Sequence, residues 1–157
     1  MNQTEKRQSI HVTMMGIAQV MSTRSTCARR KVGAVITNAD NQILSTGYNG
    51  VPRGWLHCIN IPCAGATSPS GTNIDACEAV HAEANAIAQC HAIDKAHSVY
   101  VTTMCCVSCI KLLLNTAIQD IYFIEKYAQS ERVIELWCKG NRRMIEMKGP
   151  IINIDAK

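Results

Sequence analysis

One pair of short motifs constrains this chain more than any other feature. His81-Ala82-Glu83 is followed downstream by Cys106-Val107-Ser108-Cys109. One histidine and two cysteines give zinc three protein ligands and leave a fourth position for water, which distinguishes catalytic zinc sites from closed structural ones. Glu83 stands two residues after the histidine, where its carboxylate can handle a proton of that water without being a ligand. The fold must therefore bring these two segments together.

The two motifs are informative together and weak apart. A lone C-x-x-C in an intracellular protein could be a redox pair or half of a zinc site. In this order the motifs match H-x-E followed by P-C-x-x-C, the signature of zinc-dependent nucleobase deaminases. The one departure is Cys105, which stands where the signature has proline. The alternative is a helix histidine beside a thioredoxin-like thiol pair, and it explains neither Glu83 nor the further cysteines.

Length and composition predict a single domain over residues 1–157. The chain is 47% hydrophobic and 18% charged, which is ordinary for a globular protein with a core. No apolar run approaches the ~20 residues of a membrane span, and residues 1–7 lack the apolar core of a signal peptide. We therefore expect a cytoplasmic protein without a membrane partner.

Nine cysteines are many for such a chain. An odd count without a signal peptide argues against a disulfide framework and favours metal ligation. Cys90, Cys105 and Cys138 have no place in a metal site and are predicted to be small buried hydrophobic residues.

The net charge of +4 is unevenly placed. No acidic residue lies between Glu5 and Asp40, and the basic residues of that interval are Lys6, Arg7, Arg24, Arg29, Arg30 and Lys31. A local basic patch suits a phosphorylated small ligand. A nucleic-acid partner usually requires more charge over a larger face, so we expect none.

Hydrophobic periodicity predicts strands alternating with helices. Helices are expected over residues 7–23, 76–91 (capped by Asp75), 106–115 and 130–139 (with Ser130 as a cap). Strands are expected over residues 31–37, 42–48, 98–103 and 119–125, with a fifth at 143–147 or 151–154. This order predicts a three-layer α-β-α sandwich, a mixed five-stranded sheet with helices on both faces. The proline- and glycine-containing segment 49–75 is long for a loop and should have a functional or metal-bound reason.

With these motifs the chain resembles the deoxycytidylate (dCMP) deaminases, of the bacterial competence-operon and phage kind. The resemblance covers roughly residues 10 to 127. It is carried by Arg24-Ser25-Thr26-Cys27, by residues 32–36 and 45–54, by residues 81–87 and by Cys106-Val107-Ser108-Cys109. It implies a cytidine deaminase-like fold and the hydrolysis of dCMP to dUMP and ammonia, a supply of thymidylate precursor. If the chain is phage-encoded, its compartment is the host cytoplasm.

The resemblance also implies a role for each matching residue. His81, Cys106 and Cys109 hold the catalytic zinc, which lowers the pKa of a bound water to about 7 in well-studied sites. Glu83 takes that proton, passes it to N3 of the cytosine and then protonates the leaving amine. The backbone N–H of Ala82 donates to the pyrimidine O2. The further candidates are Asn49 for the deoxyribose hydroxyl and Arg29, Lys31 and Arg24 for the 5′-phosphate.

Members of this family often carry a second zinc. Cys27 and Cys58 lie at the matching positions, and Cys63 and Cys77 complete four sulfurs, with His57 as the alternative ligand. A closed site of this kind is structural and would attach the long loop to the first helix.

Many such enzymes are hexamers activated by dCTP and inhibited by dTTP. Their effector site contains the stretch that here is Gly47, Tyr48, Asn49, Gly50, Pro52 and Gly54. The resemblance therefore implies a homo-oligomer with deoxynucleotide substrate and effectors. Cysteine in place of proline at Cys105 should loosen the entry to the following helix and alter the pocket beside the pyrimidine.

Four alternatives remain at this point. The same zinc chemistry could serve another base substrate, such as C5-modified dCMP, dCTP or a tRNA adenosine, although RNA would favour a wider basic surface. Free cytidine is a weaker candidate, because that branch usually offers cysteine where His81 stands. A zinc-binding module without chemistry would have no use for Glu83. A thiol oxidoreductase would use Cys106 and Cys109 as a redox pair and bind no metal.

Overall fold

The computed structural model describes residues 7–69, 71–149 and 151–153. Its strands are β1 (Gly33–Asn38), β2 (Ile43–Tyr48), β3 (Ala96–Thr103), β4 (Asp120–Glu125) and β5 (Arg143–Glu146). They form one five-stranded sheet in the order β2-β1-β3-β4-β5. β1 is antiparallel to both β2 and β3, whereas β3, β4 and β5 run parallel. The predicted mixed sheet is confirmed, and residues 143–146 supply its fifth strand.

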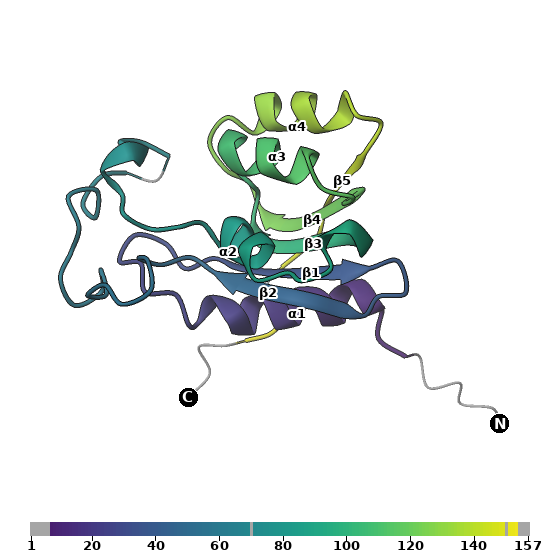
Figure 1. The fold of residues 1–157 in the computed structure, drawn as a ribbon, viewed down its shortest axis with the longest axis horizontal. Helices are drawn as coiled ribbons and strands as arrows, with labels where there is room; N and C mark the ends of the chain where they lie inside the picture. Colours follow the sequence, from purple (N-terminus) through teal and green to yellow (C-terminus); the bar gives the residue numbers. More distant parts are fainter. Residues whose placement is uncertain (1–6, 70, 150, 154–157) are drawn as a thin grey trace.

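Helices cover both faces of this sheet (Figure 1). Side chains alternate along each strand, so neighbouring residues enter different cores. Val35 and Tyr100 face α1 (Ile10–Ser22), whereas Ile36 and Val101 face the opposite layer. That layer consists of α2 (Ala82–Ala88), α3 (Val107–Leu114) and α4 (Ser130–Cys138). The three-layer sandwich inferred from the sequence is therefore confirmed.

The second predicted helix begins later than expected. Residues 74–76 form only a short 3-10 turn, η1 (Ile74–Ala76), and the chain is extended at His81 before α2 starts at Ala82. Gly50 and Val80 pair as an isolated bridge through two backbone hydrogen bonds of 2.8 and 3.1 Å. This pairing uses backbone groups that a longer helix would need, so the predicted start and the Asp75 cap are wrong. The helix also ends earlier, at Ala88, and a second 3-10 turn, η2 (Ile93–Lys95), precedes β3.

Two smaller predictions are corrected at the other helices. Gln129, not Ser130, is the N-cap of α4, and Cys106 is the N-cap of α3 rather than its first residue. The three unassigned cysteines also differ from one another. Cys105 is fully buried, Cys90 is half-buried, and Cys138 is exposed on α4, so the prediction of a buried hydrophobic residue is wrong for Cys138.

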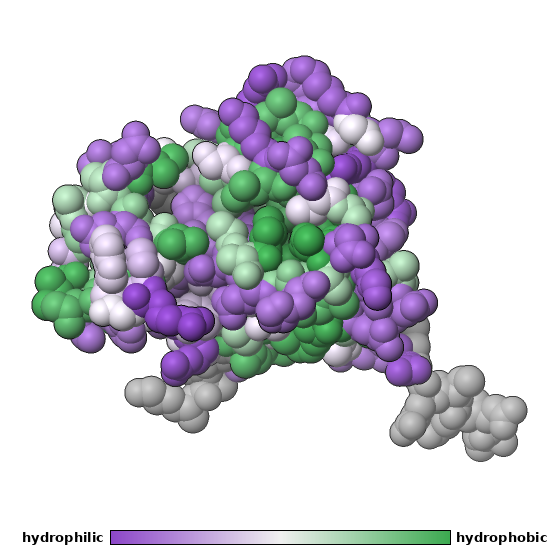
Figure 2. Space-filling view, in the orientation of Figure 1, coloured by the Kyte–Doolittle hydropathy of each residue, from purple (hydrophilic) through white to green (hydrophobic). Residues whose placement is uncertain are grey.

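The connection between β2 and α2 extends to one side of the sandwich (Figure 1). Apolar side chains are exposed along it, and Figure 2 shows the resulting green patch at its outer end. The exposed large apolar residues of this connection are Trp55, Leu56, Ile59, Ile61 and Ile74. Later in the connection, Gly65 donates its N–H to the carbonyl of Ala76 at 2.9 Å, which joins two parts of the connection to each other.

Within the described residues, no helix has the length and apolar character needed to cross a membrane.

Candidate metal centre and active-site pocket

Two helix starts bring the motif residues together. His81 is the N-cap of α2, and Glu83 lies in the first turn of that helix. Cys106 is the N-cap of α3, where its sulfur accepts the backbone N–H of Cys109 at 3.5 Å. Because α3 follows β3 by three residues, its start is held at the carboxyl end of a central strand. The two segments predicted to meet therefore do so at this edge of the sheet.

The donor geometry fits a zinc ion. Nδ1 of His81 lies 3.4 Å from the Sγ of Cys106 and 3.4 Å from the Sγ of Cys109. Tetrahedral zinc with ordinary Zn–S and Zn–N bonds separates a sulfur from a nitrogen by about 3.5 Å. Across the described part of the chain, these three side chains are the only group of three or more His, Cys, Asp or Glu with ligand atoms all within 4.8 Å of one another.

The protonation equilibria of these groups are linked. A hydrogen bond from the Cys109 thiol, with a smaller contribution from His81, lowers the pKa of Cys106 to about 4. The same bond to Cys106, together with burial, raises the pKa of Cys109. Hydrogen bonding to Cys106 also raises the pKa of His81. Cys106 thus carries thiolate character, and metal binding requires deprotonated cysteines and a neutral histidine.

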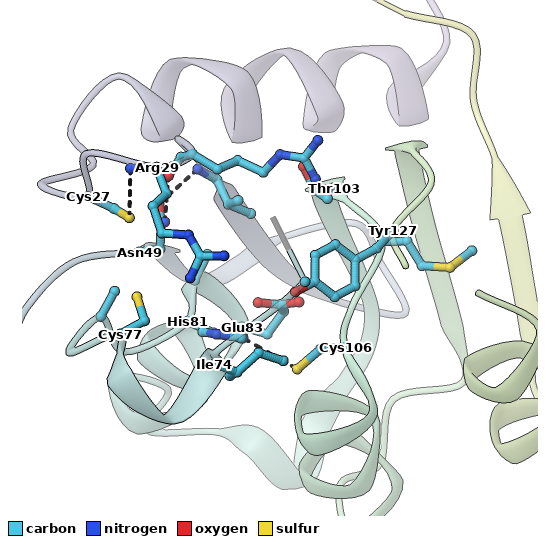
Figure 3. Close-up of a pocket in the computed structure, with 16 residues that line it drawn as sticks. Cys27, Arg29, Asn49, Ile74, Cys77, His81, Glu83, Thr103, Cys106 and Tyr127 are labelled. Carbon is cyan, nitrogen blue, oxygen red and sulfur yellow. Dashed lines mark hydrogen bonds between the residues drawn. The ribbon is translucent and has the colours of Figure 1, made fainter. Parts of the chain in front are cut away.

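Glu83 is a buried carboxylate beside this ligand group. Its exposed fraction is 4%, and it is not a member of the group. Burial raises the pKa of its carboxyl group, while its own backbone N–H and the charge of His81 lower it. A carboxyl group whose pKa is moved toward neutrality by burial is suited to both taking and giving a proton. Figure 3 shows the carboxylate pointing into the cavity.

The cavity contains several of the residues predicted for the substrate. Ala82 and Asn49 line it beside His81 and Glu83. Asn49 is 7% exposed, and its side-chain amide is fixed by the backbone of the preceding segment. Its Oδ1 accepts the N–H of Val32 at 2.8 Å, and its Nδ2 donates to the carbonyl of Arg30 at 2.7 Å. Asn49 thus holds the 30–32 segment against the site.

The basic residues divide into two groups. Arg29 lines the cavity, and its guanidinium donates to the carbonyls of Pro69 and Thr72. Arg30, which sequence reasoning did not select, lines the same cavity. Lys31 lines a different hollow between α1 and the segment after β5. Arg24 is exposed just after the end of α1 and is not among the residues that line the cavity.

Sequence reasoning also missed the far wall of the cavity. Thr103 is the last residue of β3, Met104 comes directly after it, and Tyr127 comes two residues after β4. All three residues line the cavity. Figure 3 shows Tyr127 projecting into it opposite Arg29. The predicted strand ends could have indicated these residues, because ligands bind at the carboxyl ends of parallel strands in α/β sheets. Gly71 and Ile74 of the long connection also line the cavity, and nothing in their residue types indicated this.

The four cysteines predicted for a second zinc lie in one neighbourhood. Sγ of Cys58 is 3.6 Å from Sγ of Cys63, close to the ~3.8 Å between sulfurs in a tetrahedral zinc site. Burial, with smaller contributions from the nearby Cys27 and Cys63, raises the pKa of Cys77. No three of the four sulfurs lie within 4.8 Å of one another. Backbone N–H groups are directed at these sulfurs, as from Arg29 to Cys27 at 3.4 Å. His57, the alternative ligand, is exposed.

The stretch predicted to bind effectors begins as part of the sheet. Gly47 and Tyr48 are the last residues of β2, and Gly47 lies directly under α2. Gly50 forms the bridge to Val80, and Pro52 and Gly54 lie in the turn beyond it. Gly54 has a φ of +87°, a conformation that favours glycine.

Comparison with known proteins agrees with this site. The family model of the cytidine and deoxycytidylate deaminase zinc-binding region matches residues 8–125. The deoxycytidylate deaminase of Mycobacterium phage D29 is 37% identical over 115 residues, which cover 69% of this chain and 89% of that protein. The deoxycytidylate deaminase of Saccharomyces cerevisiae is 29% identical over 119 residues, 74% of this chain but only 38% of that protein.

A solved structure shows the same fold. The crystal structure of dCMP deaminase from the cyanophage S-TIM5 in complex with dCMP and dUMP aligns with 91% of this chain and 100% of its own, with a TM-score of 0.70 at 24% identity.

Proposed function

Because the chain belongs to the cytidine and deoxycytidylate deaminase family, we propose that it hydrolyses dCMP to dUMP and ammonia. The observation that carries this proposal is Glu83, a buried carboxylate beside a three-ligand group that fits zinc. A structural zinc site would have no need of it. The D29 relative, named for the same reaction, supports the substrate, since 69% of this chain aligns with 89% of that protein.

The residues of the cavity have different roles in the proposed reaction. His81, Cys106 and Cys109 would hold zinc, which when bound acidifies water and supplies the nucleophile. Glu83 accepts a proton from the water and transfers it to N3 of the base. It then takes the remaining proton from the hydroxyl added at C4 and delivers it to the departing amine, which leaves as ammonia. Ala82 is the first residue of α2, and the N–H groups at a helix start lack intrahelical partners, so it can donate to the pyrimidine O2.

Recognition of the nucleotide falls to the opposite side of the cavity. Asn49, which is held by the 30–32 backbone and lines the cavity, is our candidate for contacting the deoxyribose hydroxyl. Arg29 is our principal candidate for the 5′-phosphate, with Arg30 beside it in the cavity. Lys31 and Arg24 become secondary candidates, because neither lines the cavity.

A second, structural zinc is part of the proposal. Cys27, Cys58, Cys63 and Cys77 would bind it and attach the long connection to the segment after α1. The 3.6 Å pair of sulfurs and the N–H groups directed at these cysteines support it.

Regulation and assembly rest on the family resemblance. We include activation by dCTP and inhibition by dTTP through the 47–54 stretch, and a hexamer in the cytoplasm. The exposed apolar side chains near residues 55–61 are surface that assembly would bury.

One experiment tests the main proposal. Zinc per chain is measured on a sample whose ammonia release is assayed with dCMP, dCTP, cytidine and adenosine, each with and without dCTP or dTTP as effector. We expect about two zinc ions and turnover of dCMP. Zinc without turnover of any cytosine nucleotide would refute the proposed reaction.

A further inference from the structure

A groove adjoins the catalytic cavity on the side of α3, and none of the roles proposed above uses it. It has a volume of about 290 Å³, and we call it the side groove. It shares with the cavity the residues Ile74, His81, Cys106 and Tyr127 (Figure 3). Because two of these are metal ligands, the two spaces meet where the reacting carbon of a substrate has to lie.

The side groove has a mixed lining of its own. Apart from the ligand Cys109, the residues that line it and not the cavity are Ala84, Val107, Ser108, Leu112, Ala128 and Gln129. Four of these side chains are apolar, and those of Ser108 and Gln129 are polar. No hydrogen bond holds either polar side chain to the described part of the chain, so both can bind a ligand. The lining therefore suits a small group that contains both carbon and a hydroxyl.

The contacts proposed for the base decide which ring atom faces this groove. Glu83 acts on N3 and the N–H of Ala82 binds O2, and both residues line the cavity but not the groove. In a pyrimidine ring, C4 lies between N3 and C5, and C5 is directly opposite C2, the carbon that carries O2. With C4 at the metal ligands, C5 therefore points away from Ala82 and Glu83 and toward the side groove.

We propose that the side groove is a subsite for a small polar substituent on C5, so that the chain deaminates 5-hydroxymethyl-dCMP as well as dCMP. The inference rests on the proposed deamination and adds a substrate class to the same site. A hydroxymethyl group has about the bulk of two water molecules, ~60 Å³, which the groove can contain. Water is added at C4 and ammonia leaves, while the C5 substituent is carried unchanged into 5-hydroxymethyl-dUMP.

Filling the groove tests the subsite. Leu112 is 49% exposed at its outer wall, and Leu112→Trp would occupy part of the space. Lys111→Trp is the matched control, because Lys111 is exposed on the same helix and does not line the groove. The readout is the ratio of kcat/KM for 5-hydroxymethyl-dCMP to kcat/KM for dCMP.

We expect the wild-type ratio to lie within about tenfold of one, since the groove leaves the substituent room. Leu112→Trp should lower this ratio about tenfold or more, and Lys111→Trp should leave it unchanged. A wild-type ratio below about one hundredth, or the same ratio in both tryptophan variants, would overturn the proposal.

The polar part of the lining is tested with 5-methyl-dCMP, which fills the groove but has no hydroxyl. We expect Ser108→Ala combined with Gln129→Ala to lower kcat/KM for 5-hydroxymethyl-dCMP about twofold to tenfold relative to that for 5-methyl-dCMP. Equal losses on both nucleotides would overturn the preference for a polar substituent.

Calorimetry on the zinc-loaded Glu83→Gln variant tests the subsite without turnover. We expect the Kd of 5-hydroxymethyl-dCMP to lie within about tenfold of that of dCMP, and we expect added Leu112→Trp to raise it about tenfold or more relative to dCMP. If these Kd values are found but the wild type releases no ammonia from dCMP, the subsite stands and the proposed reaction fails. Binding of dCMP without binding of 5-hydroxymethyl-dCMP would refute the subsite alone, and binding of neither would refute both.

Discussion

A glutamate with 4% exposure cannot be hydrated as a surface glutamate is, and burial raises the pKa of the Glu83 carboxyl group. Its location beside the ligand group means that its proton transfers can be tested separately from metal binding. We expect Glu83→Gln to reduce ammonia release about a hundredfold to ten-thousandfold, the usual range for a lost general base. Zinc per chain should stay unchanged, because Glu83 is not a ligand. Glu131→Gln on exposed α4 is the matched control and should leave turnover intact.

Arg29 and Lys31 are two residues apart and make a second test at this scale. Arg29 lines the cavity and Lys31 does not. We expect Arg29→Ala to lower kcat/KM for dCMP about tenfold or more, while kcat/KM for deoxycytidine, which has no phosphate, changes little. Lys31→Ala should affect neither substrate. Because Arg29 also contacts the carbonyls of Pro69 and Thr72, an equal loss on both substrates would show that its role is to hold the loop.

At the residue scale, some site residues could be predicted from the sequence, but the phosphate-binding residues within the basic run 29–31 could not. The metal ligands and Glu83 could be selected because their spacing is imposed by the chemistry. The phosphate candidates could not be ranked, since adjacent arginines and lysines are equivalent in charge. Only the turn of the backbone decides which of them enter the cavity, and that turn depends on Asn49, nineteen residues from Arg30.

At the scale of elements, the packing of α2 on β2 controls where Glu83 lies. A Cβ added at Gly47 would lie 2.2 Å from the carbonyl oxygen of Ala82 and 2.6 Å from the nitrogen of Ala86. Both are backbone atoms, so the helix would have to move. We expect Gly47→Ala to destabilise the fold by about 2 kcal/mol or more and to reduce turnover, as measured by thermal unfolding and ammonia release.

Gly16→Ala is the control for this prediction. Gly16 lies inside α1, and its added Cβ would meet only side-chain carbons at 3.5 and 3.8 Å. Alanine is the better helix former, so the free energy of unfolding should stay equal or rise by about 0.5–1 kcal/mol. A stable and fully active Gly47→Ala would contradict the requirement for this close approach.

The same packing explains what could not be predicted about α2. The alanine-rich sequence indicated a helix from residue 76, as propensity alone suggests. The bridge between Gly50 and Val80 keeps residues 77–81 extended, and it joins segments thirty residues apart. The positions of the strands and the layers followed from local periodicity, whereas this helix start depends on a long-range pairing that no local pattern contains.

For the molecule as a whole, the long connection 49–76 has little core of its own. Its exposed apolar side chains and its glycines and prolines cannot by themselves hold it against the cavity that Gly71 and Ile74 line. A metal-bound cluster of Cys27, Cys58, Cys63 and Cys77 would supply that attachment. The connection and the catalytic site would then be coupled through the shape of the cavity, and not through a shared ligand.

Cys63→Ser tests this coupling, with exposed Cys138→Ser as its control. Cys63 is in the pair with Cys58 at 3.6 Å, so serine should weaken the second zinc and leave the His81 site occupied. We expect zinc to fall from about two ions per chain to about one, with Tm lowered by about 5 °C, since loss of a structural metal costs some 2 kcal/mol or more.

Limited proteolysis should cut within residues 49–76 before the sandwich unfolds. Turnover of dCMP should decline through a higher KM, because the wall of the cavity is loosened while Glu83 and its neighbours stay in place. A metal content equal to that of Cys138→Ser would show that the four cysteines hold the connection without zinc.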